Sequence, residues 1–185
     1  MKPLTKLANQ TVIYGLSSVI GRLLNYLLVP LYTRYFVPAE YGVVTEMYAY
    51  VAFLVVFLTY GMETAFFRFA QKEKNINKAY STTLISITIT SITFLSITFL
   101  SSQSIANWMG YTQNKEYIEW FAIIVVLDAI SSISFAKLRQ KNKAIRFSLI
   151  RILNIFCNIG CNIYFIVFKG LGIEYIFIAN LISSI

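Results

Sequence analysis

Long apolar stretches separated by short polar gaps constrain this chain more than any other feature of its sequence. A helix needs about 20 mostly apolar residues to cross a bilayer. Five stretches reach that length, roughly residues 11–35, 41–67, 79–101, 117–136 and 147–168, and a sixth begins near residue 175 and is cut off at Ile185. Charged residues make up only 13% of the chain, about half the fraction found in soluble domains. The sequence therefore predicts an all-α integral membrane protein, a six-helix transmembrane bundle whose sixth helix is truncated.

The basic residues are concentrated in alternate gaps. Eleven of the 16 lysines and arginines lie at the N-terminus and in the gaps after the second and fourth stretches, whereas three lie in the other gaps. Cytoplasmic loops carry such an excess of Lys and Arg. The N-terminus and these two gaps are therefore predicted to face the cytoplasm. A nucleic-acid partner is not expected, because the basic residues are split among short segments and form no single basic face.

One stretch contains a pattern that favours a strand. Isoleucine alternates with Ser and Thr from Ile85 to Thr90, and β-branched residues at alternating positions are typical of strands. A membrane barrel requires such alternation in every segment, yet the neighbouring stretches are continuous apolar runs. Residues 79–101 are therefore predicted to form a helix whose hydroxyls bond to carbonyls one turn earlier or to neighbouring helices.

Residue types that carry much of enzyme chemistry are absent. The sequence has no histidine, and Asp128 is its one aspartate. Histidine is the usual proton shuttle and the commonest metal ligand, and paired aspartates would be needed to hold a metal for sugar-nucleotide transfer. We therefore expect a protein that is not an enzyme and that uses no metal and no cofactor. A membrane glycosyltransferase is the alternative that these absences weaken.

Arg22 stands near the middle of the first stretch, roughly 16 Å from its start on a helix rising ~1.5 Å per residue. It belongs to a polar stripe on an otherwise apolar helix, whose members recur three, four or seven positions apart: Thr11, Gly15, Ser18, Arg22, Asn25 and Tyr32. Charges inside a membrane usually face a cavity or a partner. Arg22, Asn25 and Ser18 are therefore predicted to bind an anionic substrate in an aqueous cavity. In the alternative hypothesis, Arg22 pairs with Asp128, the acid at the closest depth.

Two further charges, Glu63 and Arg68, close the second stretch near the predicted cytoplasmic surface. They are predicted to pair with each other or to gate the cytoplasmic mouth, and Asp128 is a third candidate for a structural ion pair. The basic gap at residues 137–146 is interpreted as a determinant of topology that also contacts anionic lipid headgroups.

Several motifs in roughly the first 80 residues carry a family resemblance. They are the runs Tyr14-Gly15-Leu16, Gly21-Arg22-Leu23, Pro30-Leu31-Tyr32-Thr33-Arg34, Pro38-Ala39-Glu40-Tyr41-Gly42, and YGMETAFFRF at residues 60–69. Together they resemble the opening of bacterial polysaccharide (O-antigen type) flippases of the multidrug/oligosaccharidyl-lipid/polysaccharide exporter superfamily. Beyond these motifs the similarity is one of topology.

The resemblance implies that residues 1–185 are the N-terminal lobe of a two-lobe exporter in the bacterial cytoplasmic membrane, with the C-terminal lobe absent. It implies alternating-access movement of an isoprenoid-pyrophosphate-linked oligosaccharide for surface polysaccharide such as lipopolysaccharide O-antigen. Arg22 and Asn25 would then bind the pyrophosphate or sugar headgroup. A single lobe is expected to be inactive alone.

The same resemblance implies a set of partners and two alternatives. The partners are the lipid-linked oligosaccharide, membrane lipids, a polysaccharide polymerase and glycosyltransferases. One alternative is a cation-coupled multidrug exporter of the same superfamily, which is expected to keep an acid deep in the first stretch, where this chain has Arg22. The other is a non-transporting scaffold of a polysaccharide assembly complex, which a dry and fully packed polar stripe would favour.

Overall fold

The computed structural model describes residues 12, 14–16, 19–20, 23–24, 26–72 and 76–184. These residues contain helices and no strand, which confirms the all-α prediction. The helices are α2 (Leu28–Tyr35), α3 (Pro38–Thr59), α4 (Met62–Lys72), α5 (Ile76–Leu100), α6 (Ser102–Met109), α7 (Lys115–Gln140), α8 (Ala144–Asn162) with a π-helical continuation (Ile163–Phe168), and α9 (Glu174–Ser184).

Within the described residues, four helices are long and apolar enough to cross a membrane. They are α3 together with α4, α5, α7, and α8 with its continuation. The predicted stretch 11–35 lies partly outside the described residues, and α2 forms its end. The 11 residues of α9 extend only ~16 Å, about half of the hydrocarbon core. The described residues therefore show four spanning helices and not the predicted six.

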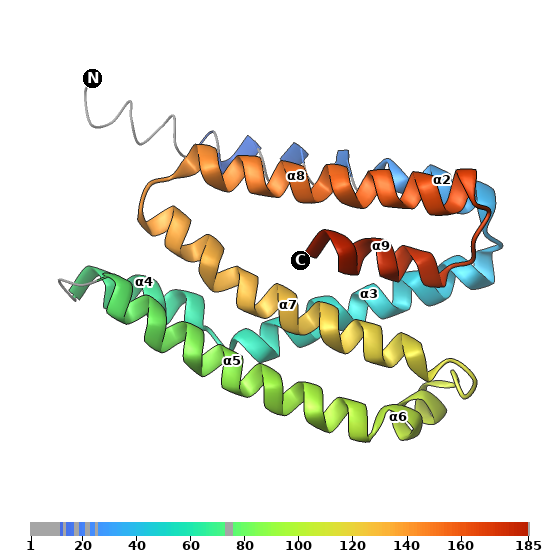
Figure 1. Cartoon of the computed structure of the whole chain (residues 1–185), viewed down its shortest axis with the longest axis horizontal. Helices are drawn as coiled ribbons and strands as arrows, with labels where there is room; N and C mark the ends of the chain where they lie inside the picture. The colour runs from blue at the N-terminus through green and yellow to red at the C-terminus, as the bar shows by residue number, and fades with distance from the viewer. Residues whose placement is uncertain are drawn as a thin grey trace.

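α7 is the central helix of the bundle. It packs against α3, α4, α5, α6, α8 and α9. In its most apolar 18-residue segment 44% of the residues are buried, against 22% in the corresponding segment of each of the other three spanning helices. Small or branched side chains on its inward faces, among them Ala129, Ile133 and Ala136, are fully buried. Such side chains let neighbouring helices approach closely. Figure 1 shows α7 crossing the molecule with α8 on one side and α5 on the other.

The distribution of polarity is inverted relative to a soluble protein. On α8 the apolar side chains of Leu153 and Phe156 are 72% and 61% exposed, whereas Asn162 is completely buried. On α5 the isoleucines at 85, 89 and 92 face outward, whereas Thr83 and Ser91 are buried. A surface that remains apolar after folding matches lipid rather than water. Together with the long apolar helices, this pattern defines a membrane protein.

The hydroxyl-rich α5 is helical, as predicted. Thr83 donates to the carbonyl of Ala79 at 2.9 Å, and Thr88 donates to that of Leu84 at 2.8 Å. Each of these bonds closes within one helical turn, so the hydroxyl is satisfied without a partner from another helix. The segment that alternates like a strand is thus stable as a helix in an apolar environment.

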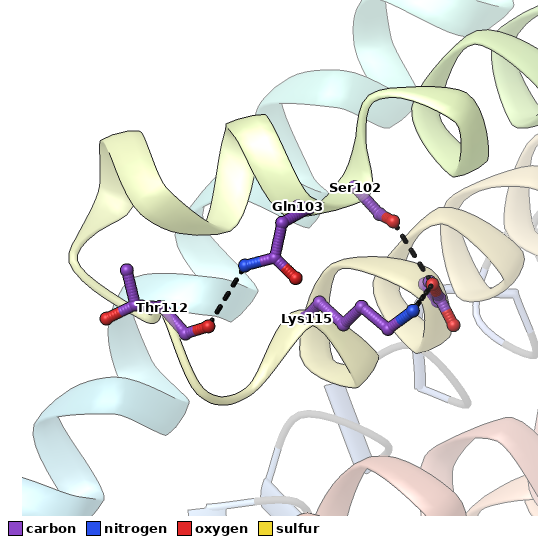
Figure 2. Close-up of polar contacts among 5 residues, drawn as sticks. Ser102, Gln103, Thr112 and Lys115 are labelled. Atoms are coloured by element: carbon purple, nitrogen blue, oxygen red, sulfur yellow. Dashed lines mark hydrogen bonds and ion pairs between the residues drawn. The ribbon is translucent and has the colours of Figure 1, made fainter.

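Several polar contacts join α6 to the start of α7 and to the loop between them. Ser102 donates to the carboxylate of Glu119 at 3.1 Å, and the ammonium group of Lys115 lies 4.0 Å from the same carboxylate. Gln103 donates to the carbonyl of Thr112 at 3.0 Å, as Figure 2 shows. These contacts hold α6 against the start of α7 at the end of the bundle where the basic residues are few.

The two basic gaps lie at the same end of the bundle. Figure 1 shows the end of α4, the start of α5 and the α7–α8 connection at the left, and the α2–α3, α6–α7 and α8–α9 connections at the right. The Lys141 ammonium group donates to the amide oxygen of Asn77 at 3.4 Å, so the end of α7 touches the start of α5. This arrangement agrees with the alternation on which the prediction of orientation is based.

Cysteine labelling tests the orientation. Asn114 and Asn142 are both exposed but lie at opposite ends of α7, so they form a matched pair. With Cys157 and Cys161 replaced, an impermeant thiol reagent on intact cells is expected to label Asn114→Cys and to leave Asn142→Cys unlabelled. Permeabilised cells serve as the control, in which both positions should react. Labelling of Asn142→Cys in intact cells would reverse the predicted orientation.

Candidate functional site

A polar cavity of about 350 Å³ lies where five helices meet: α2, α3, α7, α8 and α9. We call it the central cavity. Apart from Leu28, its lining side chains all carry oxygen or nitrogen, namely Tyr32, Tyr48, Asp128, Asn154, Asn158, Asn180, Ser183 and Ser184. Asp128 is ~20 Å along α7 from its start at Lys115, so the cavity lies near the middle of a spanning helix.

Amide side chains of α8 form one wall of the central cavity. Asn154, Asn158 and Asn162 are four residues apart and therefore share one face of the helix. The amide of Asn158 donates to the hydroxyl of Ser183 at 3.2 Å, and the amide of Asn154 donates to the backbone carbonyl of Ser183. These bonds tie α9 to α8 and so fix the position of α9 in the bundle.

A buried network joins α2 to the same face of α8. The Tyr32 hydroxyl donates to the amide oxygen of Asn162 at 3.0 Å. The amide nitrogen of Asn162 in turn donates to the backbone and side-chain oxygens of Asn158, at 2.9 and 3.1 Å. Since all of these groups are away from water, the network fixes the position of the wall. α8 continues beyond Asn162 as a wider π-helix, a variation that often accompanies functional sites.

Asp128 is the one acid of the central cavity. Asn180 and Ser184 of α9 line the same cavity, and the Ser184 hydroxyl donates to the amide oxygen of Asn180 at 3.4 Å. Among the described residues, Asp128 has no cationic partner in an ion pair. The hypothesis that it pairs with Arg22 stays a prediction, because Arg22 lies outside the described residues. Arg22, Asn25 and Ser18 all lie there, so their predicted role in binding is likewise untested.

Glu63 pairs with a residue that the sequence did not suggest. Its carboxylate forms an ion pair with Arg139 of α7, whereas Arg68 is exposed. The partner of Glu63 in the structure thus differs from Arg68, the partner suggested by the sequence. Both residues lie in α4, but at five positions apart they are ~140° apart around the helix, so their side chains leave it on different faces. A break precedes α4, where Tyr60 and Gly61 adopt left-handed backbone angles, with φ of 33° and 74°. α4 starts anew after this break, and α4 packs against α7. A gating role for Glu63 and Arg68 stays a prediction.

Most residues that line the central cavity were not predicted from the sequence. Asn154, Asn158, Asn180, Ser183 and Ser184 were not singled out there, although they line the central cavity. A signal was present, since asparagines four residues apart in an apolar stretch mark a polar helical face. Tyr32 belongs to the predicted polar stripe and does line the cavity.

Metal binding finds no support in the described part of the chain. No group of three or more His, Cys, Asp or Glu side chains gathers there in a way that could hold an ion. The central cavity offers instead hydroxyl and amide groups, which donate and accept hydrogen bonds with uncharged polar ligands. The expectation that the protein works without a metal or a cofactor stays a prediction.

Long apolar helices around a polar, mid-depth cavity define a class of protein: an all-helical membrane protein with an internal polar site. Within this class the comparison of sequences is specific. A family described as "Polysaccharide biosynthesis protein" matches residues 31–185, and the chain belongs to this family. Membership indicates involvement in polysaccharide biosynthesis. No curated protein and no protein of solved structure gives a significant match.

Proposed function

We propose that this chain forms one lobe of a transporter that moves an isoprenoid-pyrophosphate-linked oligosaccharide from the cytoplasmic to the outer leaflet of the bacterial cytoplasmic membrane. Transport is by alternating access, without enzymatic chemistry. The observation that carries the proposal is the central cavity, because five helices direct amide and hydroxyl groups to one place inside an apolar bundle. Polar groups are costly in hydrocarbon and usually mark a substrate path.

The chemistry of the cavity suits a saccharide. Sugar hydroxyls both donate and accept hydrogen bonds, as do Asn, Ser and Tyr side chains. In the proposed protein the stripe of Arg22, Asn25 and Ser18 supplies the cationic part of the site and neutralises the pyrophosphate. The family match to polysaccharide biosynthesis supports this choice of substrate class. A polysaccharide polymerase and glycosyltransferases are the proposed protein partners, and the product is surface polysaccharide such as O-antigen.

One observation favours a second candidate function. Asp128 places an acid in the central cavity, and an acid inside a membrane is a usual carrier of coupling protons or cations. A cation-coupled multidrug exporter of the same superfamily would use it. The flippase and the exporter differ in their substrates, since a drug exporter moves amphiphilic drugs and has no requirement for a diphosphate or a sugar.

A leaflet-exchange assay tests the proposal. The full-length protein is reconstituted in liposomes with a fluorescent isoprenoid-diphosphate-linked oligosaccharide, and dithionite is added outside. Protein-free liposomes should lose about half of the fluorescence, because only the outer leaflet is accessible, whereas active protein should expose nearly all of it. Unchanged protection of the inner leaflet would refute the flippase, and would favour the scaffold if a drug substrate is also not moved.

A substitution in the wall of the cavity adds a second test. Asn158→Leu removes an amide that lines the cavity and bonds to Ser183. We expect leaflet exchange to slow by about tenfold, the effect of losing one good polar contact of ~1.4 kcal/mol. Ser96→Leu is the matched control, since its hydroxyl bonds within α5 and faces outward. Equal slowing by both substitutions would indicate general damage rather than a role of the cavity.

A further inference from the structure

A second polar pocket lies at the basic end of the bundle. It has a volume of about 260 Å³ and is lined by residues of α4, α7 and α8 and by Tyr14. Two guanidinium groups reach it, from Arg139 and Arg151, together with one carboxylate, from Glu63. With two cations and one anion, the pocket carries a net positive charge. We call it the arginine pocket.

The arginine pocket and the central cavity lie along the same helix faces. On α7, Asp128, Ser132 and Arg139 are four and seven residues apart and share one face. On α8, Arg151 and Asn158 are seven residues apart and share another. Ser132 and Arg139 line the arginine pocket, and Asp128 lines the central cavity. The rise of ~1.5 Å per residue puts the two sites ~16 Å apart along α7, from Asp128 to Arg139.

The arginines are held in place from several sides. Arg139 stacks over the ring of Phe67 at 5.5 Å and pairs with Glu63, while Arg151 lies 5.8 Å from the ring centre of Phe147. The Nε atom of Arg139 is buried and has no hydrogen-bond partner among the described residues. A buried donor without an acceptor is unfavourable. The pocket therefore has capacity for a further acceptor oxygen.

We infer that the arginine pocket binds the phosphate group of an anionic lipid, and that Glu63 is the internal anion that occupies Arg139 until the phosphate displaces it. Guanidinium groups form paired, charge-assisted hydrogen bonds with phosphate oxygens. The diphosphate of a lipid-linked saccharide and the phosphate of a phospholipid share this chemistry. The inference rests on the proposed transport function for its biological meaning: the pocket is where the headgroup docks before it reaches the central cavity.

Binding of a short isoprenoid diphosphate tests the inference directly. The full-length protein is placed in nanodiscs of phosphatidylcholine, and radiolabelled farnesyl diphosphate is titrated. Arg139→Gln and Arg151→Gln are each expected to weaken binding by roughly tenfold, the effect of losing a hydrogen bond to a charged group. Arg146→Gln is the matched control, because Arg146 is exposed in the same basic gap and does not line the pocket. Binding that is unchanged in both pocket variants, or equally weakened in the control, would overturn the inference.

Glu63→Gln separates an ion pair that only stabilises the fold from one that competes with the ligand. Removing the competing carboxylate is expected to tighten diphosphate binding severalfold. A purely structural pair predicts instead that Glu63→Gln weakens binding or leaves it unchanged, which would refute the competitive role. Competition by phosphatidylglycerol distinguishes the sources of phosphate: displacement of the label assigns the pocket to phospholipid headgroups, and its absence assigns the pocket to the diphosphate.

The outcomes for this inference and for the proposed function can be told apart. If the wild-type protein exchanges the oligosaccharide between leaflets and the double variant Arg139→Gln/Arg151→Gln does so at the same rate, the docking role fails and the flippase stands. If the wild-type protein exchanges nothing while diphosphate binding depends on both arginines, the flippase fails and the arginine pocket stands.

Discussion

Arg22→Ala in the full-length protein is expected to abolish export of the lipid-linked saccharide while leaving protein abundance nearly unchanged. A cation near mid-bilayer is costly unless it serves a function, and Arg22 belongs to a stripe whose member Tyr32 lines the central cavity. Arg22→Lys is expected to retain part of the activity, since lysine binds phosphate as a point charge but lacks the bidentate fork. Surface polysaccharide and protein level are the two measurements.

The alternative hypothesis, an ion pair between Arg22 and Asp128, predicts a different pattern. Arg22→Ala would then leave the Asp128 carboxylate unpaired, at a cost of about 3–5 kcal/mol, and the amount of folded protein would fall. Asp128→Asn introduced in the same protein would restore it. Rescue by this double variant would make Arg22 a structural residue and would rule out its role in binding the substrate.

Asn162→Leu is expected to destabilise the bundle by about 1–3 kcal/mol, the cost of leaving a buried polar group without its partner. Asn162 is completely buried and accepts the hydrogen bond from the Tyr32 hydroxyl that links α2 to α8. Leucine has a similar volume, so the loss reflects hydrogen bonding rather than a cavity. The midpoint of thermal unfolding in detergent, followed by circular dichroism, measures the effect.

A double-mutant cycle isolates the contribution of this hydrogen bond. Tyr32→Phe removes the donor, so the variant Tyr32→Phe/Asn162→Leu should lose less stability than the sum of the two single variants. Ser96→Ala is the control, because its exposed hydroxyl bonds only to the carbonyl of Ile92 in the same helix; we expect a change within about 0.5 kcal/mol. Additive losses would contradict a direct coupling between α2 and α8.

Local properties of the sequence were sufficient to predict the type of each long segment in the described part of the chain. Because a spanning helix must match a fixed bilayer thickness, the predicted bounds of α5, of α7 and of α8 with its π-helical continuation lie within a few residues of the observed ones. The hydroxyl-rich α5 was also correctly predicted, since Thr and Ser bond to their own helix. The apolar start predicted near residue 175 lies one residue from the observed start of α9 at Glu174.

The partners of the charged and polar side chains could be identified only from the tertiary structure. Glu63 pairs with Arg139, which is 76 residues away in the sequence, rather than with the nearer Arg68. Glu63 and Arg68 share α4 but lie five positions apart, on different faces of that helix. A pairing across such a distance depends on how helices pack, and the sequence pattern of one helix does not contain that information.

The sequence by itself determined the class of the protein and the approximate bounds of α5 and α7, and it predicts an orientation, because hydropathy and charge act residue by residue along a chain that must match a bilayer. Only the tertiary structure decided which polar side chains meet. Asn158 from α8, Ser183 from α9 and Asp128 from α7 lie on separate stretches, yet they line one cavity. The physical reason is that polar groups in an apolar bundle are satisfied by partners from whichever helices pack against them, and packing is a property of the whole fold.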